Sequence, residues 1–541
     1  MKNLFKSGDI FLWFTGAVLG MIMFLVAGLL LIVSLQGVGV FWPGSVAEVE
    51  LKDGRRFAGE IMQEENIPLA NVPDAYKEAV QTRIQVKTGN RDIYGLDFKW
   101  LNTYDIASLQ YPDDFVIIER REFGNFYGRV ASISENGTII ASGAQATETL
   151  DQFLRKALDV HDEQLHLEKG EGGRINRAIE DTRLEIKRLK FYKEDTPELL
   201  SSLEAEIHRL QEAYQGIQKQ LETLHLKTSG MYVSVITTDG QTRDLPVSKI
   251  VRFYQPNTMN TFEKSGFYIS KIFEYLTDEP RESNTEGGVF PAIFGTVMMV
   301  FLMNLVVVPF GVVAALYLRE YAKQGIAVRL IRIAVNNLAG VPSIVFGIFG
   351  LGFFVYFCGG TIDQLFYPDR LPTPTWGTGG ILWASLTLSL LTVPVVIVAT
   401  EEALTTVPKG VRDASLALGA TKWQTTWRVV IPASTPGILT GVILAMARGA
   451  GEVAPLMITG VVKLAPNLPL DGSFPFFHLD RKFMHLGFHI YDVGFQSPNV
   501  EAAKPMVFMT ALLLITIVLL LNLTAIIVRA RLRKKYQGSA F

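Results

Sequence analysis

The chain has 541 residues, more than one ordinary domain, and 49% of them are hydrophobic. Its mean hydropathy is +0.24, and the apolar residues come in long blocks. A formal net charge of -2 without a basic domain argues against a nucleic-acid partner, and the single cysteine, Cys358, excludes an internal disulfide and a cysteine-based metal site.

The chain opens with a short basic segment, Met1 to Asp9, and continues with an almost wholly apolar run from Ile10 to Gly39. This run is long enough to cross a hydrocarbon core of about 30 Å. A cleaved signal peptide would have a shorter apolar core that ends in a small-x-small site. Residues 1–40 are therefore predicted to form a cytoplasmic N-terminus and an uncleaved first transmembrane helix.

Residues 41–286 are polar and contain three signatures of β-hairpins. The dipeptides Asp53-Gly54, Asn136-Gly137 and Asp239-Gly240 lie beside stretches in which apolar and polar residues alternate. No catalytic arrangement accompanies them. We expect β modules around a helical centre, which together form an α+β insertion.

The centre of the insertion, residues 146–227, has heptad patterning and is predicted to be an antiparallel coiled-coil hairpin. Thr196-Pro197 is typical of a helix start. A rigid spacer is favoured over a partner-binding arm. His208 and His225 lack companion ligands, so no metal site is expected. The repeated positions are Ile175, Ile179, Thr182, Ile186 and Leu189, then Leu203, Ile207, Leu210, Tyr214, Ile217, Leu221 and Leu224.

Residues 287–541 contain five further apolar runs of membrane length. With the first helix they predict an all-α polytopic membrane protein of about six transmembrane helices, interrupted by the α+β insertion. The five runs are Val289 to Leu318, Ile331 to Phe357, Ile381 to Ala399, Thr435 to Val462, and Met506 to Val528.

Basic residues predict how the chain is oriented. They gather in four segments that alternate with the apolar runs, so all four are expected in the cytoplasm and the insertion in the periplasm. Both termini are then cytoplasmic, in the inner membrane of a double-membrane bacterium. Besides Met1 to Asp9 and the loop 401–434, the basic residues are Arg319, Lys323, Arg329 and Arg332, and Arg529, Arg531, Arg533, Lys534 and Lys535.

The loop 401–434 has a sustained helical pattern, unlike the short turns between the other apolar runs. Gly419 interrupts this pattern, which predicts a kink or a close backbone contact, and Pro432 is expected to end the segment. An ordinary cytoplasmic loop helix is the simple interpretation. A helix that docks on a soluble partner is the alternative.

The residues Asp413, Ala414, Ser415, Gly419 and Pro432 resemble the EAA motif of ABC importer permeases. In that family this loop forms the coupling helix, which fits into a cleft of the ATPase subunit. Asp replaces Glu and Ser replaces the second Ala of the triplet, and both changes are chemically mild. The resemblance implies that these five residues couple the chain to an ATPase.

Several membrane segments also look like the phosphate-specific (Pst) permeases, chiefly Gly287 to Thr296, Asn336 to Phe354 and Ala447 to Gly460. The last of these favours the A-type subunit. The resemblance covers Gly287 to Arg533 and leaves out the insertion, which is far larger than the loop usual in the family. It implies a C-type permease subunit, a B-type ATPase dimer, a periplasmic phosphate-binding protein, inorganic phosphate and membrane lipid as partners.

Arg448 and Glu452 lie near the middle of the predicted span Thr435 to Val462, one helical turn apart. Intramembrane charges are costly and mark functional sites, although a structural ion pair is the alternative. The Pst resemblance implies that this pair is needed for transport. Asn336, Asn337 and Ser343 are further candidates to line the substrate pathway.

These observations predict the permease subunit of an ATP-driven phosphate importer. The chain has no Gly-x-x-x-x-Gly-Lys-Ser/Thr loop and so no ATPase site of its own. No cofactor is expected on this chain, and the partner ATPase would use ATP-Mg. A permease for another oxyanion and a membrane-anchored periplasmic scaffold or sensor remain as alternatives.

Overall fold

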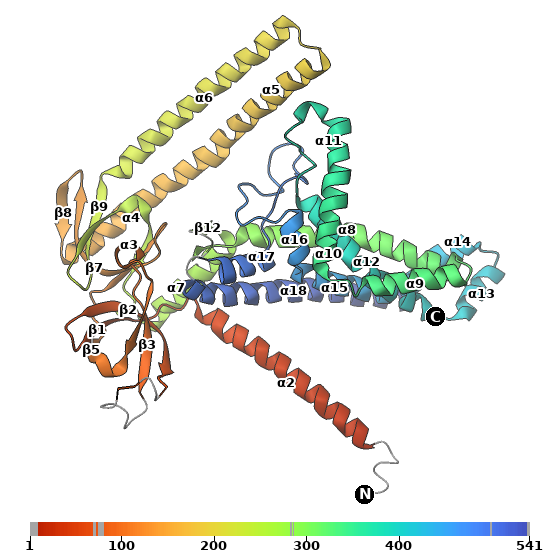
Figure 1. Cartoon of the computed structure of the whole chain (residues 1–541), viewed down its shortest axis with the longest axis horizontal. Coiled ribbons are helices and arrows are strands. Elements are labelled where there is room, and N and C mark those ends of the chain that lie inside the picture. The colour runs from red at the N-terminus through yellow and green to blue at the C-terminus, as the bar shows by residue number, and fades with distance from the viewer. Residues whose placement is uncertain are drawn as a thin grey trace. The chain divides into compact units, whose positions relative to one another are not determined.

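The computed structural model describes residues 9–68, 72–73, 81–281, 284, 286–497 and 500–537. The predicted basic segment Met1 to Asp9 therefore lies almost wholly outside the described residues. The chain forms two compact units (Figure 1). The membrane unit comprises 1–40, 276–279 and 289–541, and the insertion unit comprises 41–275 and 280–288.

The membrane unit contains, within the described residues, six helical runs long and apolar enough to cross a membrane, which confirms the predicted number. They are Phe11–Gly39, Phe290–Tyr321, Ser343–Phe366, Ile381–Thr405, Lys422–Gly451 and Ala503–Leu532. The helices that form them are α2 (Asp9–Gly39), α8 (Phe290–Leu316), α10 (Ser343–Phe349), α11 (Gly360–Phe366), α12 (Ile381–Thr405), α14 (Lys422–Thr425), α15 (Ile431–Gly451) and α18 (Val500–Gln537), with π-helical turns in several runs.

Helix α12 is the centre of this unit and packs against both α8 and α15. Two of its hydroxyls reach across to α8, where Ser389 donates to the Met303 carbonyl at 3.1 Å and Ser385 to the Met299 carbonyl at 3.5 Å. Small polar residues let helices approach closely and bond to each other in an apolar medium. The α8–α12 contact is thus specified by polar side chains as well as by apolar packing.

The third predicted span, Ile331 to Phe357, is wrong in its start. Helix α9 (Ile326–Leu338) is a separate element, and the membrane run begins at Ser343, directly after Pro342. Proline has no amide hydrogen and disfavours a helical conformation of the residue before it. The apolar composition continues across this break, which is why hydropathy alone missed it.

The fifth predicted span, Thr435 to Val462, is wrong at both ends. The helical run begins at Lys422 and ends at Gly451, and α16 (Ala454–Thr459) is a separate short helix. Pro455 in the first turn of α16 cannot donate to the Gly451 carbonyl, so the ladder of α15 cannot continue through it. The chain therefore leaves helix α15 after Gly451 and forms a separate short helix instead of one continuous span.

The insertion unit is built on two antiparallel sheets. The five-stranded sheet has the order β4-β3-β2-β1-β5, and the second has β10-β9-β7-β6-β11 with β8 paired to β7. The strands are β1 (Val46–Leu51), β2 (Arg56–Asn66), β3 (Thr82–Lys87), β4 (Phe98–Asn102), β5 (Ile106–Gln110), β6 (Val116–Arg120), β7 (Phe126–Glu135), β8 (Thr138–Ser142), β9 (Met231–Ile236), β10 (Thr242–Pro246) and β11 (Ile250–Tyr254).

All three predicted hairpins are present. β1 pairs with β2, β7 with β8, and β9 with β10. The turns contain Gly54, Gly137 and Gly240 with φ of 86°, 80° and 81°. Glycine adopts this left-handed conformation without steric cost, so the local sequence was sufficient to define each turn.

Helix α4 (Ala144–Leu165) covers one face of the six-stranded sheet and completes its core. Leu150 and Leu154 of α4 pack with Phe126, Ile133 and Val233 of the strands in one buried cluster. Phe126 has no exposed surface. Without a disulfide, apolar burial of this kind holds the unit together.

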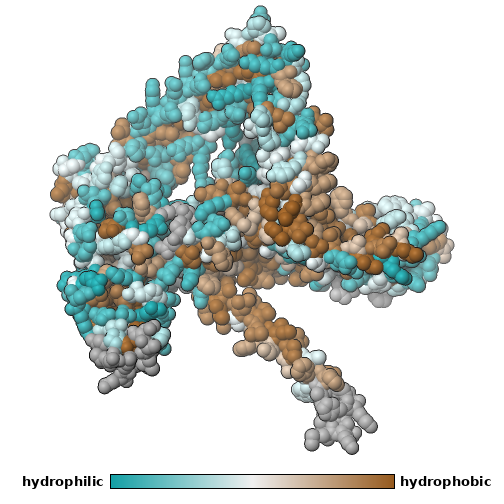
Figure 2. Space-filling view, viewed as in Figure 1, coloured by the Kyte–Doolittle hydropathy of each residue, from teal (hydrophilic) through white to brown (hydrophobic). Residues whose placement is uncertain are grey.

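A helical hairpin projects from this core (Figure 1). Its first arm continues from α4 through a π-helical turn into α5 (Gly173–Tyr192), and its second arm is α6 (Pro197–Ser229). Thr196 caps α6 by accepting from the Leu199 amide, as its sequence predicted. Figure 2 shows a mostly hydrophilic surface on these arms. Supercoiling of the pair remains a prediction.

We predict that residues 41–288, expressed without the spans, fold and have circular dichroism of mixed helix and strand. In this fragment Phe126→Ala should lower the free energy of unfolding by about 3–5 kcal/mol, because it leaves a cavity in the core. Phe191→Ala at the hairpin tip, where the ring is 54% exposed, is the matched control and should change stability by less than about 0.5 kcal/mol. Equal effects of the two variants, measured by urea unfolding, would contradict this core assignment.

Candidate functional site

The predicted docking segment 401–434 contains two helices and not a single one. Helix α13 (Lys409–Ala417) ends at Leu418, and Thr421 caps α14 through a reciprocal pair of bonds with Gln424. Between them Gly419 has φ of 86°. Its amide donates to the Leu416 carbonyl at 2.9 Å, and the next amide donates to the Ser415 carbonyl at 3.2 Å, which is the glycine C-terminal motif of helices.

Of the two explanations predicted for Gly419, the interruption of the helix agrees with the end of α13, and the close backbone contact is corrected. A Cβ atom there would meet open space, so no close backbone contact within this chain requires glycine. The requirement is the positive φ, which side chains with a Cβ adopt only at a cost. Pro432 is also corrected, because it lies in the first turn of α15 within a continuous helical run and does not end a segment.

The segment exposes apolar side chains, which is unusual for a surface loop. Leu418 is 90% exposed, and Val411, Leu416, Trp423 and Trp427 are also exposed. The two tryptophan rings stack with centroids 5.5 Å apart. An apolar patch on an otherwise polar loop is typical of a protein contact surface.

The remaining predicted coupling residues all lie on α13. Asp413 and Ala414 are exposed on α13. Ser415 lies 2.9 Å from Thr425 between the two hydroxyl oxygens, so it joins α13 to α14. Thus Asp413 and Ala414 face outward, whereas Ser415 holds the two helices together.

A clamp that the sequence did not reveal attaches α13 to the span α8. The Arg412 guanidinium donates to Glu320 at 3.0 Å and to the Leu404 carbonyl at 2.7 Å. Both side chains of the ion pair are mostly buried, with 18% and 14% exposed. Arg332 and Glu401 form a second pair at 3.1 Å nearby. Pairs so distant in sequence have no local signal, which is why they were missed.

The charged pair Arg448 and Glu452 lies where α15 ends. The Arg448 Nε and a Glu452 carboxylate oxygen are 3.7 Å apart. Arg448 is in the last helical turn, and Glu452 is the first residue with an extended backbone, at φ of -79° and ψ of 133°. The prediction of one continuous helix through both residues is wrong.

The depth of this pair in the membrane stays a prediction, and one packing contact bears on it. A Cβ atom on Gly449 would meet the Met303 sulfur at 2.5 Å, and Met303 lies midway between Phe290 and Leu316, the ends of α8. The pair is thus level with the middle of a membrane-spanning helix, where a charge is expensive. The negative end of the α15 dipole offsets part of the cost for Arg448.

The other predicted pathway residues do not join this pair. Asn336 and Asn337 are exposed at the end of α9, outside the membrane run in which they were predicted, and Ser343 is the partly buried first residue of α10. Among the described residues, no hydrogen bond or ion pair links them to Arg448. An intramembrane residue that the sequence analysis missed is Asn304, whose buried amide oxygen has no hydrogen-bond partner.

The segment after α16 forms a structured loop that caps α12. The first amides of α12 are satisfied by this loop, with Ile381 donating to the Arg481 carbonyl at 2.9 Å and Leu382 to the Leu479 carbonyl at 3.0 Å. Within the loop, Asp471 accepts from Arg481 at 2.6 Å and from the Ser473 amide at 2.9 Å. These bonds leave few orphan groups at the helix end.

Helix α17 (Leu486–Tyr491) follows this loop and carries two buried histidines. His485 caps α17 by accepting from the Gly487 amide at 3.1 Å through Nδ1, while its Nε2 has no partner. Burial lowers the pKa of His485 to about 3 and that of His489 to about 4. Both rings are therefore neutral near pH 7.

Comparisons with known proteins agree with this architecture. The profile of the family described as "Binding-protein-dependent transport system inner membrane component" matches residues 307–536. The chain is 32% identical to the probable ABC transporter permease protein YqgI of Bacillus subtilis over 237 residues, which are 42% of this chain and 74% of that relative.

Two further relatives are phosphate transport system permease proteins. The chain is 35% identical to PstA 1 of Mycobacterium tuberculosis over 45% of this chain and 71% of the relative. It is 32% identical to PstA of Yersinia pestis over 48% of this chain and 78% of the relative. Other PstA and PstC relatives are matched over 58% to 63% of their length. A chain of the MetNI methionine ABC transporter aligns with a TM-score of 0.34 at 18% identity, too distant to support an argument.

The buried histidine predicts a pH dependence of stability. The pKa of His485 is about 3 in the folded chain and about 6.5 when the ring is exposed in the unfolded chain. As the pH falls below 6.5, His485 therefore becomes protonated in the unfolded chain while it stays neutral in the folded chain. Lowering the pH from 7.5 to 5.5 should therefore reduce the free energy of unfolding by about 1 kcal/mol through the protonation of this residue in the unfolded chain.

The variant His485→Asn keeps an oxygen that can cap α17 but cannot titrate. Its thermal midpoint in detergent should fall less between pH 7.5 and 5.5 than that of the wild type. His225→Asn, on the exposed face of α6, is the control and should retain the wild-type dependence. An unchanged pH dependence in His485→Asn would contradict the assignment.

Proposed function

The chain belongs to the binding-protein-dependent ABC importer permeases, as a PstA-type inner-membrane component, and we propose from this that it is the permease subunit of an ATP-driven phosphate importer. A homologous C-type permease would complete the translocation pathway. Two copies of a separate ATPase would use ATP-Mg, and a periplasmic phosphate-binding protein would deliver the substrate.

The observation that carries this proposal is the Arg448–Glu452 pair at mid-depth. Its separation of 3.7 Å is longer than a hydrogen bond, so the guanidinium donors are not committed to the carboxylate. Arg448 is partly exposed, with 33% of its side chain accessible. A guanidinium presents a planar fork of donors that matches phosphate oxygens, and its charge offsets the cost of an anion in an apolar surrounding.

Glu452 would act as a counter-charge to Arg448. When no anion is present, the carboxylate lowers the cost of a buried cation, and when an anion enters, it limits how tightly that anion is held. Alternation between the two partners would let phosphate bind and leave. This role requires a pair that is close but not locked in a short bidentate contact, as the 3.7 Å separation suggests.

The apolar patch of the coupling segment is proposed as the ATPase contact. Leu418 and the stacked Trp423 and Trp427 would insert into the partner, while Arg412 and Glu320 would transmit its displacement to α8. We place this segment and both termini in the cytoplasm and the insertion in the periplasm. The basic residues of the intervening loops support that orientation.

Substitution of the charged pair tests the pathway. Arg448→Gln should reduce phosphate uptake at least about tenfold. The double variant Arg448→Gln/Glu452→Gln should assemble normally yet remain inactive, because it lacks the cation that compensates the charge of the anion. Uptake into vesicles with the assembled complex is the measurement. Arg531→Gln, at an exposed position of α18, is the matched control and should transport normally.

A purely structural pair would behave differently. Removing both charges leaves none unpaired, so the double variant would then recover uptake as well as assembly. Recovery of transport in the double variant, or wild-type uptake by Arg448→Gln alone, would overturn the proposed role of Arg448.

The glycine at the end of α13 tests the coupling contact. Gly419→Ala should weaken ATPase binding by about fivefold, because a Cβ at positive φ costs roughly 1 kcal/mol and displaces the exposed Leu418. Gly419→Asn should lose less, since asparagine tolerates this conformation. Gly410→Ala, within α13 and in open space, is the control and should bind normally. Equal binding by Gly419→Ala and Gly410→Ala would contradict the coupling role of the turn.

A further inference from the structure

Helix α7 (Thr261–Thr277), at the end of the insertion unit, exposes three large apolar side chains on one face. Phe262 is 91% exposed, Ile269 is 64% exposed and Phe273 is 68% exposed. Their spacings of seven and four residues place them on the same side of a helix. The neighbouring exposed residues on that face are Gly266 and Ser270, so the face carries no charge.

The opposite face of α7 is held firmly against the sheet of the insertion unit. The ring of Phe267 lies 4.4 Å from that of Tyr254 between centroids. Tyr275 is 1% exposed and its ring lies 5.3 Å from Phe41. Asn260 and Glu263 exchange hydrogen bonds that cap the first turn. The exposed face is thus presented by a well-anchored helix and not by a frayed one.

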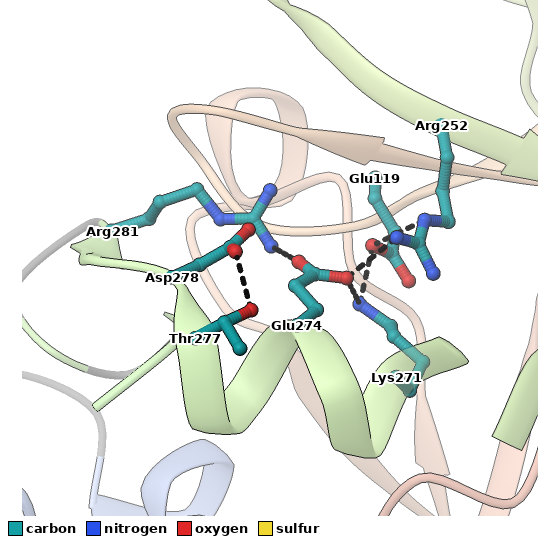
Figure 3. Close-up of polar contacts among 7 residues, drawn as sticks. All are labelled: Glu119, Arg252, Lys271, Glu274, Thr277, Asp278 and Arg281. Atoms are coloured by element: carbon teal, nitrogen blue, oxygen red, sulfur yellow. Dashed lines mark hydrogen bonds and ion pairs between the residues drawn. The ribbon is translucent and has the colours of Figure 1, made fainter. Parts of the chain in front are cut away.

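A mostly buried network of charges reinforces this anchoring (Figure 3). Lys271 of α7 donates to Glu119 of β6 at 2.7 Å, and Arg252 of β11 donates to Glu274 of α7 at 2.6 Å. Arg281 also pairs with Glu274. Burial alone raises the pKa of Glu274, but the attraction of the three cations outweighs it, so its pKa is lowered. All charges of the second half of α7 therefore point to the sheet and leave the other face apolar.

The position of α7 is limited by its contact with the chain that leaves the first span. Trp42 and Tyr268 have ring centroids 6.0 Å apart. Trp42 follows Gly39, the end of that span, by only three positions, and three extended residue steps reach at most about 11 Å. The span of 29 residues is about 44 Å of helix, which equals the thickness of a bilayer with its headgroups.

We infer that α7 is an interfacial helix that places Phe262, Ile269 and Phe273 in the lipid of the membrane leaflet from which the insertion emerges. An amphipathic helix at the headgroup level buries its apolar face in the acyl boundary, and tryptophan and tyrosine are enriched at that depth. Trp42 and Tyr268 are such residues. The inference concerns lipid contact and does not depend on which substrate the permease carries.

This contact would orient the insertion unit on the membrane. Because the charge network fixes α7 to the six-stranded sheet, burial of the opposite face in lipid sets the angle at which the whole unit stands. The hairpin arms α5 and α6 would then project from the membrane surface in one preferred direction. A unit tethered only by flexible linkers would lack such a preference.

Lipid-attached quenchers test the inference on the full chain. In a Cys358→Ser background, single cysteines at Ile269 and Phe262 are labelled with bimane, and the protein is reconstituted into vesicles of phosphatidylcholine with brominated acyl chains. Phe191→Cys at the hairpin tip is the matched control, since it is also an exposed aromatic position. Quenching by bromolipid at 262 and 269 should exceed that at 191 by roughly threefold.

Equal quenching at 269, 262 and 191 would overturn the inference. Protection of 262 and 269 from both bromolipid and aqueous iodide would also overturn it, because a protein surface and not lipid would then cover the face. Positions 262 and 269 are independent probes. If the variant at one position folds poorly, quenching at the other position still tests the lipid contact.

Discussion

Helix α15 ends inside an apolar bundle, and much of the membrane unit follows from the need to satisfy the backbone there. A helix end leaves carbonyl groups without partners, and lipid offers none. The last turn of α15 lies against α8, where a Cβ atom on Gly449 would meet the Met303 sulfur. The Thr459 carbonyl of α16 accepts from the Gly380 amide at 3.0 Å, so this short helix contacts the start of α12. Gly449 and Ala450 before the break are buried, whereas Gly451 itself is exposed.

The same break positions the charged pair. Arg448 is in the last turn of α15, and Glu452 is the first residue with an extended backbone, and their charged groups lie 3.7 Å apart. A straight helix would have carried both side chains along a lipid-facing or packed surface. Because α15 ends beside the middle of α8, the Arg448 guanidinium lies near one carboxylate and near the negative end of the helix dipole.

Helix α8 connects this site to the coupling segment. Met303 in its middle packs on Gly449, and Glu320 just beyond its end pairs with Arg412 of α13. Both are contacts of one continuous helical run, Phe290–Tyr321. A displacement of α13 by a partner would therefore act on the same rigid element that lies beside the charged pair. If the proposed roles hold, this helical run would provide a mechanical route between the coupling segment and the charged pair.

The sequence by itself determined the features whose causes are local. Six apolar runs, three glycine hairpin turns, the Thr196 cap and the family of the permease core were all predicted correctly, because composition, φ preference and short motifs decide them. Tertiary structure alone decided where the spans break at Pro342 and Gly451, why Gly419 is required, and which cations pair with which carboxylates. Hydropathy does not change across a break inside a bundle, and the Arg412–Glu320 pair joins residues 92 positions apart. Such contacts arise only when packing brings distant segments together.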